Sequence, residues 1–188
     1  MLSVIIPTDG AEQPAVATLA ALVPGAAAGV IREVLLVDRA GTGVIERVAD
    51  VAGCGFLPFK GSRAAALAAG ARQARSPWLM FLHAGAVLDA GWIEETTLFI
   101  QAVSGSRRPR AGIFRYARSP YAEPNWREAF KFLARSIAGP SADQGLLIAR
   151  DHYERLGGHA PDDRWSEARL LRQLGRSRTL LRSRIVVA

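Results

Sequence analysis

The chain has 188 residues, of which 49% are apolar and 22% are charged. This length supports one full hydrophobic core, and this composition excludes fibrous and intrinsically disordered proteins. The formal net charge is +7 and is uneven, because residues 1–100 hold 7 basic and 9 acidic side chains whereas residues 101–188 hold 17 basic and 8 acidic ones.

The basic second half has two interpretations. In the first interpretation, the basic residues bind an anionic partner, such as a substrate or an anionic lipid surface. Alternatively it forms an ordinary solvated surface, since 22 of the 24 basic residues are arginine and they are scattered among apolar residues. Nucleic acid is not an expected partner, because the sequence has no RNA-binding aromatic motif and no zinc-finger spacing.

Several features bear on the compartment. No apolar run approaches the roughly 20 residues that span a bilayer, and the N-terminus lacks the basic segment of a signal peptide. The single cysteine, Cys54, cannot form an internal disulfide, which fits a reducing compartment. We expect a cytoplasmic protein, with peripheral contact at the inner face of an anionic membrane as the alternative.

Strands and helices are predicted to alternate along the first half. Short apolar runs predict buried strands at residues 2–6, 33–37, 56–59 and 78–82. Apolar residues at helical spacing predict helices at residues 12–23, 44–51, 64–75 and 91–103. Pro24 and Gly25 are expected to end the first helix, and Ser62 is expected to cap the third. Such alternation is typical of βαβ units and predicts an α/β fold with a mostly parallel sheet.

The second half has a less regular pattern. Strands are predicted at residues 113–116 and 145–149, and an edge strand at residues 179–187. Helices are predicted at residues 125–137, 152–156 and 165–174. Asp151 and Glu154 have the spacing of a capping box at the start of the middle helix. No internal repeat or linker divides the chain, so we expect a single domain.

Polar or small residues follow three of the predicted strands. They are Thr8 after the first, Asp38 after the second, and His83 with Gly85 after the fourth. Open parallel sheets bind ligands beyond the carboxyl ends of their strands. A carboxylate such as Asp38 can accept hydrogen bonds from a base or a ribose there, or it can merely start a turn. Both interpretations stay open at this point.

The order of these segments resembles family 2 glycosyltransferases, which have the GT-A fold. Residues 3–8 (SVIIPT) resemble their opening strand, and residues 34–38 (VLLVD) resemble their second strand with its nucleotide-contacting Asp. Residues 79–84 (LMFLHA) resemble the strand that leads to their metal motif. Residues 81–84, together with 143–145 (DQG) and 156–158 (LGG), are similar to a radical-SAM/selenodomain-associated bacterial branch of that family.

The resemblance implies one GT-A-like domain over residues 1–188, with a nucleotide-binding half at 1–104 and an acceptor-side half at 105–188. It also implies transfer of a sugar from a nucleotide-diphosphate sugar to an unknown acceptor, with inversion at the sugar carbon. In such enzymes a Mn or Mg ion neutralises the leaving diphosphate, and a carboxylate takes the proton of the acceptor hydroxyl.

The resemblance assigns roles to particular residues. The nucleotide-contacting residues are Pro7, Thr8, Asp38, Arg63 and His83. Glu167 and Asp143 are assigned to the reacting centre, and Gln144 and Gly158 to the acceptor side. Arg63 begins a predicted helix, where a phosphate group can bind, although it can also be a solvent-facing helix residue.

Two motifs depart from the family pattern. Gly85 stands where the branch has its metal-binding Asp, so a metal would need another ligand, Asp89 or His83. Ser166-Glu167 stands where Glu-Asp is expected, so the base is Glu167, or Asp162 or Asp163 in the preceding loop. Glu167 can also be an exposed residue that the helix dipole favours.

These departures leave three functions open. The first is a glycosyltransferase. The second is a non-catalytic module of the same fold that binds a nucleotide or a sugar. The third is a nucleotidyltransferase, which needs a Gly-rich phosphate loop after the first strand, where this chain has only residues 8–10 (TDG).

Overall fold

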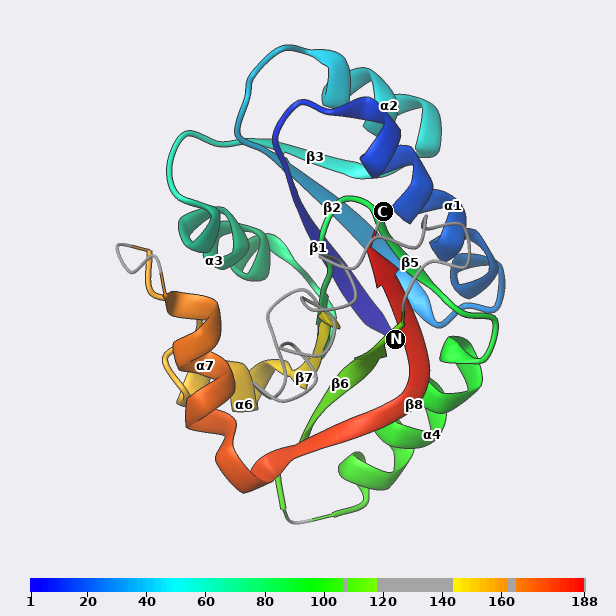
Figure 1. Ribbon diagram of the computed structural model, residues 1–188, viewed down its shortest axis with the longest axis vertical. Coiled ribbons are helices and arrows are strands. Elements are labelled where there is room, and N and C mark those ends of the chain that lie inside the picture. The colour runs from blue at the N-terminus through cyan, green and yellow to red at the C-terminus, as the bar shows by residue number, and fades with distance from the viewer. Residues whose placement is uncertain (107, 118–143, 162–164, 188) are drawn as a thin grey trace, which may run out of the picture.

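Eight strands form one mixed sheet in the computed structural model, which describes residues 1–106, 108–117, 144–161 and 165–187 (Figure 1). The strand order is β3-β2-β1-β4-β7-β6-β8-β5. Neighbours among β3, β2, β1 and β4 are parallel, as are β6 and β8, whereas β4–β7, β7–β6 and β8–β5 are antiparallel. The predicted α/β class with a mostly parallel sheet is therefore confirmed.

The first four strands lie close to their predicted positions. They are β1 (Leu2–Thr8), β2 (Ile31–Asp38), β3 (Gly55–Pro58) and β4 (Trp78–Phe81). The others are β5 (Ala86–Leu88), β6 (Ala111–Tyr116), β7 (Leu146–Ala149) and β8 (Arg178–Val187). Every residue of β1 is buried. Its near-continuous apolar sequence is typical of a parallel strand that is covered on both faces.

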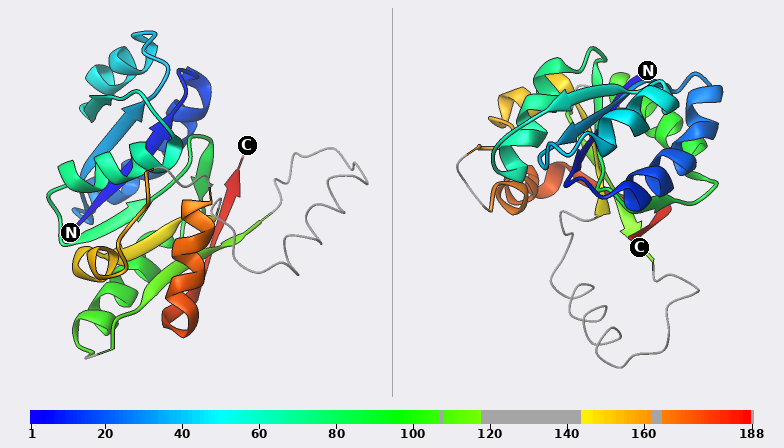
Figure 2. Two further views of the ribbon diagram at one scale, coloured as in Figure 1. Left: turned by 90° about the vertical axis from the view of Figure 1, so that its left-hand side faces the viewer. Right: turned by 90° about the horizontal axis from the view of Figure 1, so that it is seen from above.

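Helices cover both faces of the sheet (Figure 2). One core cluster joins the sheet to α1 (Glu12–Ala27), α2 (Val44–Ala52) and α4 (Trp92–Ser104). The other joins it to α3 (Arg63–Gln73), α6 (Arg150–Arg155) and α7 (Ser166–Leu174). A short 3₁₀ turn, η2 (Gly175–Ser177), connects α7 to β8. Strands from both halves of the chain share the sheet, and the division at residue 104 stays a prediction.

The first helix does not end at Pro24, so that prediction was wrong. Helix α1 continues to Ala27, and the Ala28 amide donates to the Pro24 carbonyl (2.9 Å). The reason lies in packing against α4: Gly25 is buried, and a Cβ placed on it would lie 2.3 Å from Cη2 of Trp92. The missing side chain lets the Trp92 indole pass against the last turn of α1, which holds the helix together beyond the proline.

The structure corrects two other predictions in the second half. Strand β8 is not at the edge, because it lies between β6 and β5 and pairs with β5 over residues 185–187. No pattern in the sequence predicts β5, which has three residues. Helix α6 begins at Arg150 with Ala149 as its N-cap, so Asp151 does not form the predicted capping box. The helix predicted at residues 125–137 lies outside the described residues.

Arg150 explains the early start of α6. Its amide donates to the Pro77 carbonyl (2.8 Å), and its guanidinium donates to the carbonyls of Ala71 (2.8 Å) and Ser76 (3.0 and 3.1 Å), and to that of Ala74. These carbonyls belong to the end of α3 and to the turn that follows it. A cation is favourable at the C-terminus of a helix, so Arg150 caps α3 and fixes α6 beside it.

The topology brings three strand ends to one edge of the sheet. Thr8 pairs with Asp38 where β1 and β2 end. Ile5 pairs with Phe81 near the end of β4, and the Leu82 amide donates to the Ile5 carbonyl (3.1 Å). The loops after β1, β2 and β4 therefore share the carboxyl edge, where open α/β sheets bind their ligands.

Candidate functional site

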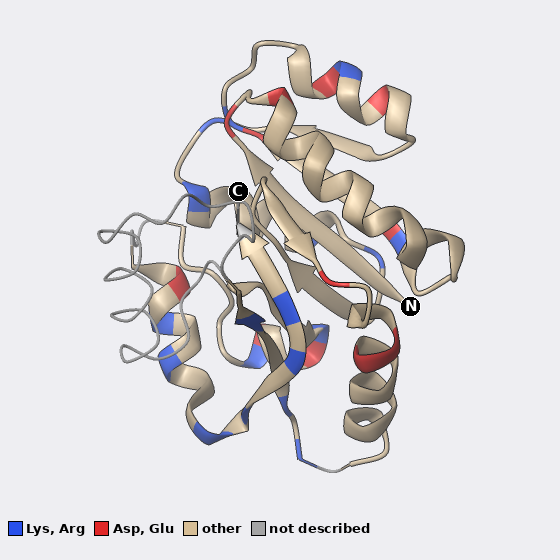
Figure 3. Ribbon diagram, turned by 45° about the vertical axis from the view of Figure 1, so that its right-hand side comes forward, with Lys and Arg blue, Asp and Glu red and all other residues tan. Residues whose placement is uncertain are grey.

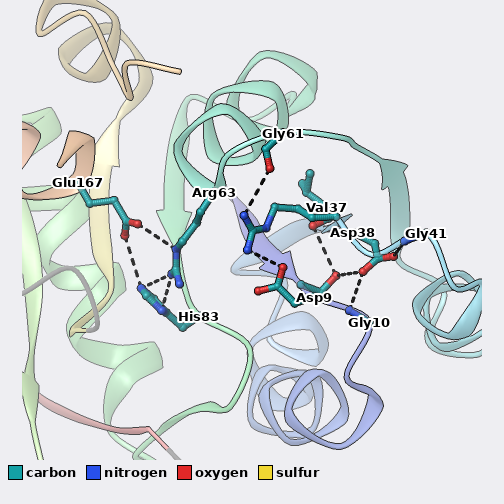
Figure 4. A network of polar contacts seen from close by, with 11 residues as sticks. Asp9, Gly10, Val37, Asp38, Gly41, Gly61, Arg63, His83 and Glu167 are labelled. Atoms are coloured by element: carbon teal, nitrogen blue, oxygen red, sulfur yellow. Dashed lines mark hydrogen bonds and ion pairs between the residues drawn. The ribbon is translucent and has the colours of Figure 1, made fainter. Parts of the chain in front are cut away.

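Asp38 holds the loops after β1 and β2 together. Its carboxylate is 1% exposed and accepts hydrogen bonds from the Thr8 hydroxyl (3.0 Å), the Gly10 amide (3.0 Å) and the Gly41 amide (2.8 Å) (Figure 4). Gly10 has φ 78°, and a Cβ on it would lie 2.8 Å from Cβ of Ala40, so this close approach requires glycine. These bonds give Asp38 the structural role that the sequence left open, and its nucleotide contact stays a prediction.

The other predicted residues on this side are placed as follows. Pro7 is buried within β1 and pairs with Val37, and Thr8 is also buried. Arg39 forms an ion pair with Asp9 (2.6 Å) at the rim of the same loops. Pro7 could contact a nucleotide through its backbone, and Thr8 through its backbone or its buried hydroxyl. Both contacts stay predictions.

A second cluster consists of Arg63, His83 and Glu167, which come from three separate elements (Figure 4). Arg63 is the first residue of α3, His83 follows β4, and Glu167 is the second residue of α7. Nε of Arg63 lies 2.9 Å from Oε1 of Glu167, and Nε2 of His83 lies 3.6 Å from Oε2. Nη2 of Arg63 contacts the His83 ring. The structure thus brings three of the predicted site residues into direct contact.

Ser62 positions two members of this cluster. Its hydroxyl oxygen accepts a hydrogen bond from the Ala65 amide (3.1 Å), which caps α3 as the sequence predicted. The same hydroxyl donates to the Pro161 carbonyl (2.6 Å) in the segment before α7. On the α7 side, the Ser166 hydroxyl accepts a hydrogen bond from the Ala160 amide (2.6 Å). Arg63 and Glu167 are therefore held at helix starts that are tied to each other.

Thr18 fixes the backbone of the third member. Its buried hydroxyl oxygen lies 3.2 Å from the His83 carbonyl and accepts a hydrogen bond from the Gly85 amide (2.9 Å). The Gly85 amide also donates to the Pro14 carbonyl (2.8 Å). The loop after β4 is thereby fastened to α1, which directs the His83 ring toward Arg63 and Glu167.

The cluster is partly shielded from water, because the side chains of His83, Glu167 and Arg63 are 12%, 22% and 33% exposed. Burial acts to raise the pKa of Glu167, but the His83 contact and the charges of Arg63, His83 and His159 hold that pKa below its ordinary value. Glu167 is therefore a carboxylate at neutral pH. In this arrangement it is a weaker proton acceptor than an isolated glutamate.

His159 lies behind the cluster and was not predicted as part of it. Burial lowers its pKa to about 4, with Glu167 raising that value and Arg63 lowering it further. Nδ1 of His159 lies 2.9 Å from the Tyr153 hydroxyl, and the His159 amide donates to the same oxygen (3.0 Å). His159 is thus a neutral side chain at pH 7 that lies next to the site and is hydrogen-bonded to Tyr153. Its position directly after the Gly157-Gly158 turn was the sole signal in the sequence.

A small cavity of about 20 Å³ adjoins Arg63, His83, His159 and Glu167. This volume has room for about one water molecule. A nucleotide or a sugar cannot enter beneath the cluster, so any such ligand must approach Arg63 and Glu167 from their exposed side.

The acceptor-side predictions have structural explanations where they can be placed. Nε2 of Gln144 donates to the Phe114 carbonyl (3.1 Å) and so joins the start of β7 to β6. Gly158 has φ 59°, and a Cβ on it would lie 2.8 Å from the Tyr153 ring, so this tight turn requires glycine. The acceptor roles of Gln144 and Gly158 stay predictions. Asp143 lies outside the described residues.

The described residues do not fit a divalent cation. No three His, Cys, Asp or Glu side chains gather among them as ligands. Gly85 has φ 92°, which disfavours any side chain at the position where the resemblance places a metal ligand.

The two alternative ligands lie in different places. Asp89 accepts a hydrogen bond from the Arg184 amide (2.9 Å) and lines a groove with Glu94 and Glu95, whereas His83 lines the small cavity. The structure therefore does not bring the two alternative ligands together, and we derive no step through a metal. Asp162 and Asp163 lie outside the described residues.

Comparisons with known proteins agree with the architecture. No protein-family model matches this chain, and no curated protein sequence matches it. A crystal structure of S. aureus TarS 1–349 superimposes on the whole chain with a TM-score of 0.71 at 14% identity, over 60% of that crystallised chain. This chain has the GT-A fold.

Two further structures of the same protein match this GT-A domain. The complex of TarS with UDP-GlcNAc gives a TM-score of 0.68 at 13% identity, and the complex with UDP gives 0.69 at 14%. All of this chain is covered in both, against 58% and 60% of TarS. The GT-A domain thus spans about three fifths of the length of these structures. Within its described part, no helix is both long and apolar enough to cross a bilayer.

Proposed function

We propose that this GT-A domain transfers a sugar from a nucleotide-diphosphate sugar to an acceptor hydroxyl, with Arg63 on the diphosphate and Glu167 as the base. The observation that carries the proposal is the contact between these two side chains at the carboxyl edge of the sheet (2.9 Å). A cation that can bind the leaving group and a carboxylate that can take a proton are the two groups that such a transfer needs.

The surroundings of the two residues support these roles. Arg63 begins α3, so the helix N-terminus adds to its attraction for phosphate. Glu167 is ionised, with Arg63 at its Oε1 (2.9 Å) and His83 at its Oε2 (3.6 Å), so it has to leave at least one of these partners before it takes a proton. TarS has been crystallised with UDP-GlcNAc and with UDP, so a UDP-linked sugar is the first donor class to test.

The proposed step is a direct displacement. The acceptor oxygen bonds to the anomeric carbon of the sugar while the bond from that carbon to the phosphate oxygen breaks. The electron pair of the broken bond leaves with the nucleoside diphosphate, whose added charge faces the Arg63 guanidinium. The acceptor proton moves to Glu167, and the configuration at the sugar carbon inverts.

Turnover of UDP-GlcNAc tests the proposal, with release of UDP as the readout. Because the acceptor is unknown, water takes its place in this assay. We expect the wild-type chain to release UDP, and Glu167→Gln to lower the rate by about 100-fold, as for loss of a general base. Glu46→Gln is the matched control, because Glu46 is exposed on α2, a helix that carries none of the three cluster residues. Equal rates for all three proteins would remove Glu167 from the reaction.

A non-catalytic binding module is the second candidate. It is favoured by the internal use of two of the predicted carboxylates, since Asp38 accepts three hydrogen bonds from its own loops and Glu167 is paired with Arg63. Binding of UDP or UDP-GlcNAc without release of sugar, unchanged by Glu167→Gln, would support the module. A nucleotidyltransferase is less consistent with the loop after β1, because the Gly10 amide already donates to Asp38.

A further inference from the structure

We propose that the Arg63–Glu167 ion pair is a closed state of the site, which a diphosphate anion opens by taking the Arg63 guanidinium away from Glu167. This inference rests on the proposed function, since it concerns the same two residues. It adds that the donor and the base compete for one cation, so that arrival of the donor releases the base.

Arg63 already uses one edge of its guanidinium for contacts within the site. Its Nε faces Oε1 of Glu167 (2.9 Å) and its Nη2 contacts the His83 ring. A guanidinium binds an anion best through two parallel N–H groups. A diphosphate that binds Arg63 through the Nε and Nη2 edge must therefore displace Glu167. A diphosphate carries more negative charge than one carboxylate, so it is the stronger partner for the same cation.

The approach to the site leads to the same conclusion. The cavity beneath the cluster holds about 20 Å³, which excludes a diphosphate from that side. Arg63 and Glu167 are 33% and 22% exposed, so part of each side chain is open to solvent, although Nε of Arg63 is itself buried. An incoming anion thus meets the ion pair itself before it can lie against the start of α3.

The backbone around the pair can remain in place during the exchange. The start of α3 is fixed by the Ser62 cap and its bond to Pro161, and the start of α7 is fixed by Ser166. Only the two long side chains have to move. Glu167 then loses its nearest counter-charge, and a carboxylate without a counter-charge accepts a proton more readily.

The titratable and charged groups that face Glu167 come from three elements in the described part of the chain. Arg63 faces it from α3, His83 from the loop after β4, and His159 from the segment before α7. Arg63 is the one among them that also lies at a helix N-terminus. A diphosphate is therefore expected to draw on Arg63 rather than on the two histidines.

Calorimetric titration with inorganic pyrophosphate, in buffer with EDTA, tests the exchange without involving turnover. Glu167→Gln removes the competitor for Arg63, so we expect it to bind pyrophosphate about tenfold more tightly than the wild type. Arg63→Gln is expected to weaken binding by about tenfold or more. In the Arg63→Gln background, Glu167→Gln should give no further gain. Glu46→Gln changes the net charge equally and controls for long-range attraction.

Each outcome bears on the inference. It is overturned if Glu167→Gln binds pyrophosphate no more tightly than Glu46→Gln, if Arg63→Gln binds as the wild type does, or if neither the wild type nor Glu167→Gln binds. Glu167→Asp keeps the negative charge and should retain the wild-type affinity for pyrophosphate, so it shows whether the effect of Glu167→Gln comes from the lost charge. Circular dichroism checks the fold of every variant. If pyrophosphate binds as predicted but UDP-GlcNAc is not turned over, the displacement of Glu167 from Arg63 stands and the proposed sugar transfer is contradicted.

Discussion

The Ser62 hydroxyl donates to the Pro161 carbonyl across 2.6 Å, so the residue that caps α3 also holds the segment before α7. Positions 62 and 161 belong to different halves of the sequence. The neighbouring Ala160 amide donates to the Ser166 hydroxyl at the start of α7, so residues 160 and 161 connect the helix that carries Arg63 to the helix that carries Glu167.

Replacing Ser62 should therefore affect both stability and the site. Ser62→Ala removes the cap and the bond to Pro161, and we expect a loss of about 1–2 kcal/mol in the free energy of unfolding. Urea denaturation measures it. Ser62→Thr keeps a hydroxyl and should lose less, and the same stability for Ala and the wild type would contradict a structural role for this hydroxyl.

The packing of Trp92 over Gly25 gives a second prediction. A Cβ at position 25 would lie 2.3 Å from the indole of Trp92, which is itself 2% exposed. We expect Gly25→Ala to lower the free energy of unfolding by about 1–3 kcal/mol, as for an overpacked core. Gly105→Ala is the control, because a Cβ there meets its nearest atom, the Gln101 carbonyl oxygen, at 3.5 Å. Thermal unfolding of both variants would decide, and equal melting temperatures would contradict the packing.

The stability of the fold should depend on pH through His159. The folded state lowers the pKa of this side chain to about 4 from 6.5, so the unfolded chain binds more protons between these values. Stability is then complete above about pH 6.5 and declines as the pH falls toward 4, with a contribution of about 2 kcal/mol lost between pH 7 and pH 5. Glu167 adds a decline in the same direction at lower pH, because its folded pKa is lowered.

Urea denaturation at pH 7, 6 and 5 measures this dependence. His159→Gln cannot titrate and should lose most of the slope between pH 7 and pH 5, even if it is less stable throughout. A slope in the variant equal to that of the wild type would assign the pH dependence to other groups.

Two arginines face each other on the second half of the sheet. Arg115 of β6 pairs with Arg184 of β8, both are exposed, and neither has an ion pair within the described residues. Figure 3 shows positive positions along β8 and α7 and acidic positions on α4. Like charges opposite one another reduce stability, so Arg184→Glu is expected to raise the free energy of unfolding by about 0.2–1 kcal/mol.

The same pair bears on the proposal of peripheral contact with an anionic membrane. We expect the wild type to sediment with phosphatidylserine vesicles at low salt and to be released at high salt, with weaker binding for Arg184→Glu. Arg47→Glu on the exposed side of α2 is the matched control. Absence of binding at low salt would make these arginines an ordinary solvated surface.

Local patterns predicted much of this fold because they report local physics. The unbroken apolar run of β1, the Ser62 cap and the strand before His83 were all readable from neighbouring residues. Pro24 misled because its effect on α1 is outweighed by Trp92, which is remote in sequence. The three residues of β5 are too few to show a period, and its pairing depends on the end of the chain.

The sequence suggested individual residues of the candidate site, but it did not predict which of them contact one another. Arg63, His83 and Glu167 each carried a signal from the family resemblance, yet their mutual pairing results from the β4–β7 neighbourhood and the loop to α7. His159 was missed because a lone histidine after a glycine turn has no pattern. Asp38 shows a different case, since a carboxylate at a strand end can serve a ligand or a loop: three internal hydrogen bonds show its role in the loops, and its contact with a nucleotide stays a prediction.

In the proposed reaction, Arg63 supplies the positive charge for the nucleoside diphosphate. The most direct measurement is calorimetric titration with UDP, with EDTA or with Mn²⁺, of the wild type and Arg63→Gln. We expect the wild type to bind UDP in EDTA and Arg63→Gln to bind it about tenfold or more weakly. Binding that needs Mn²⁺, or that Arg63→Gln leaves unchanged, would contradict it.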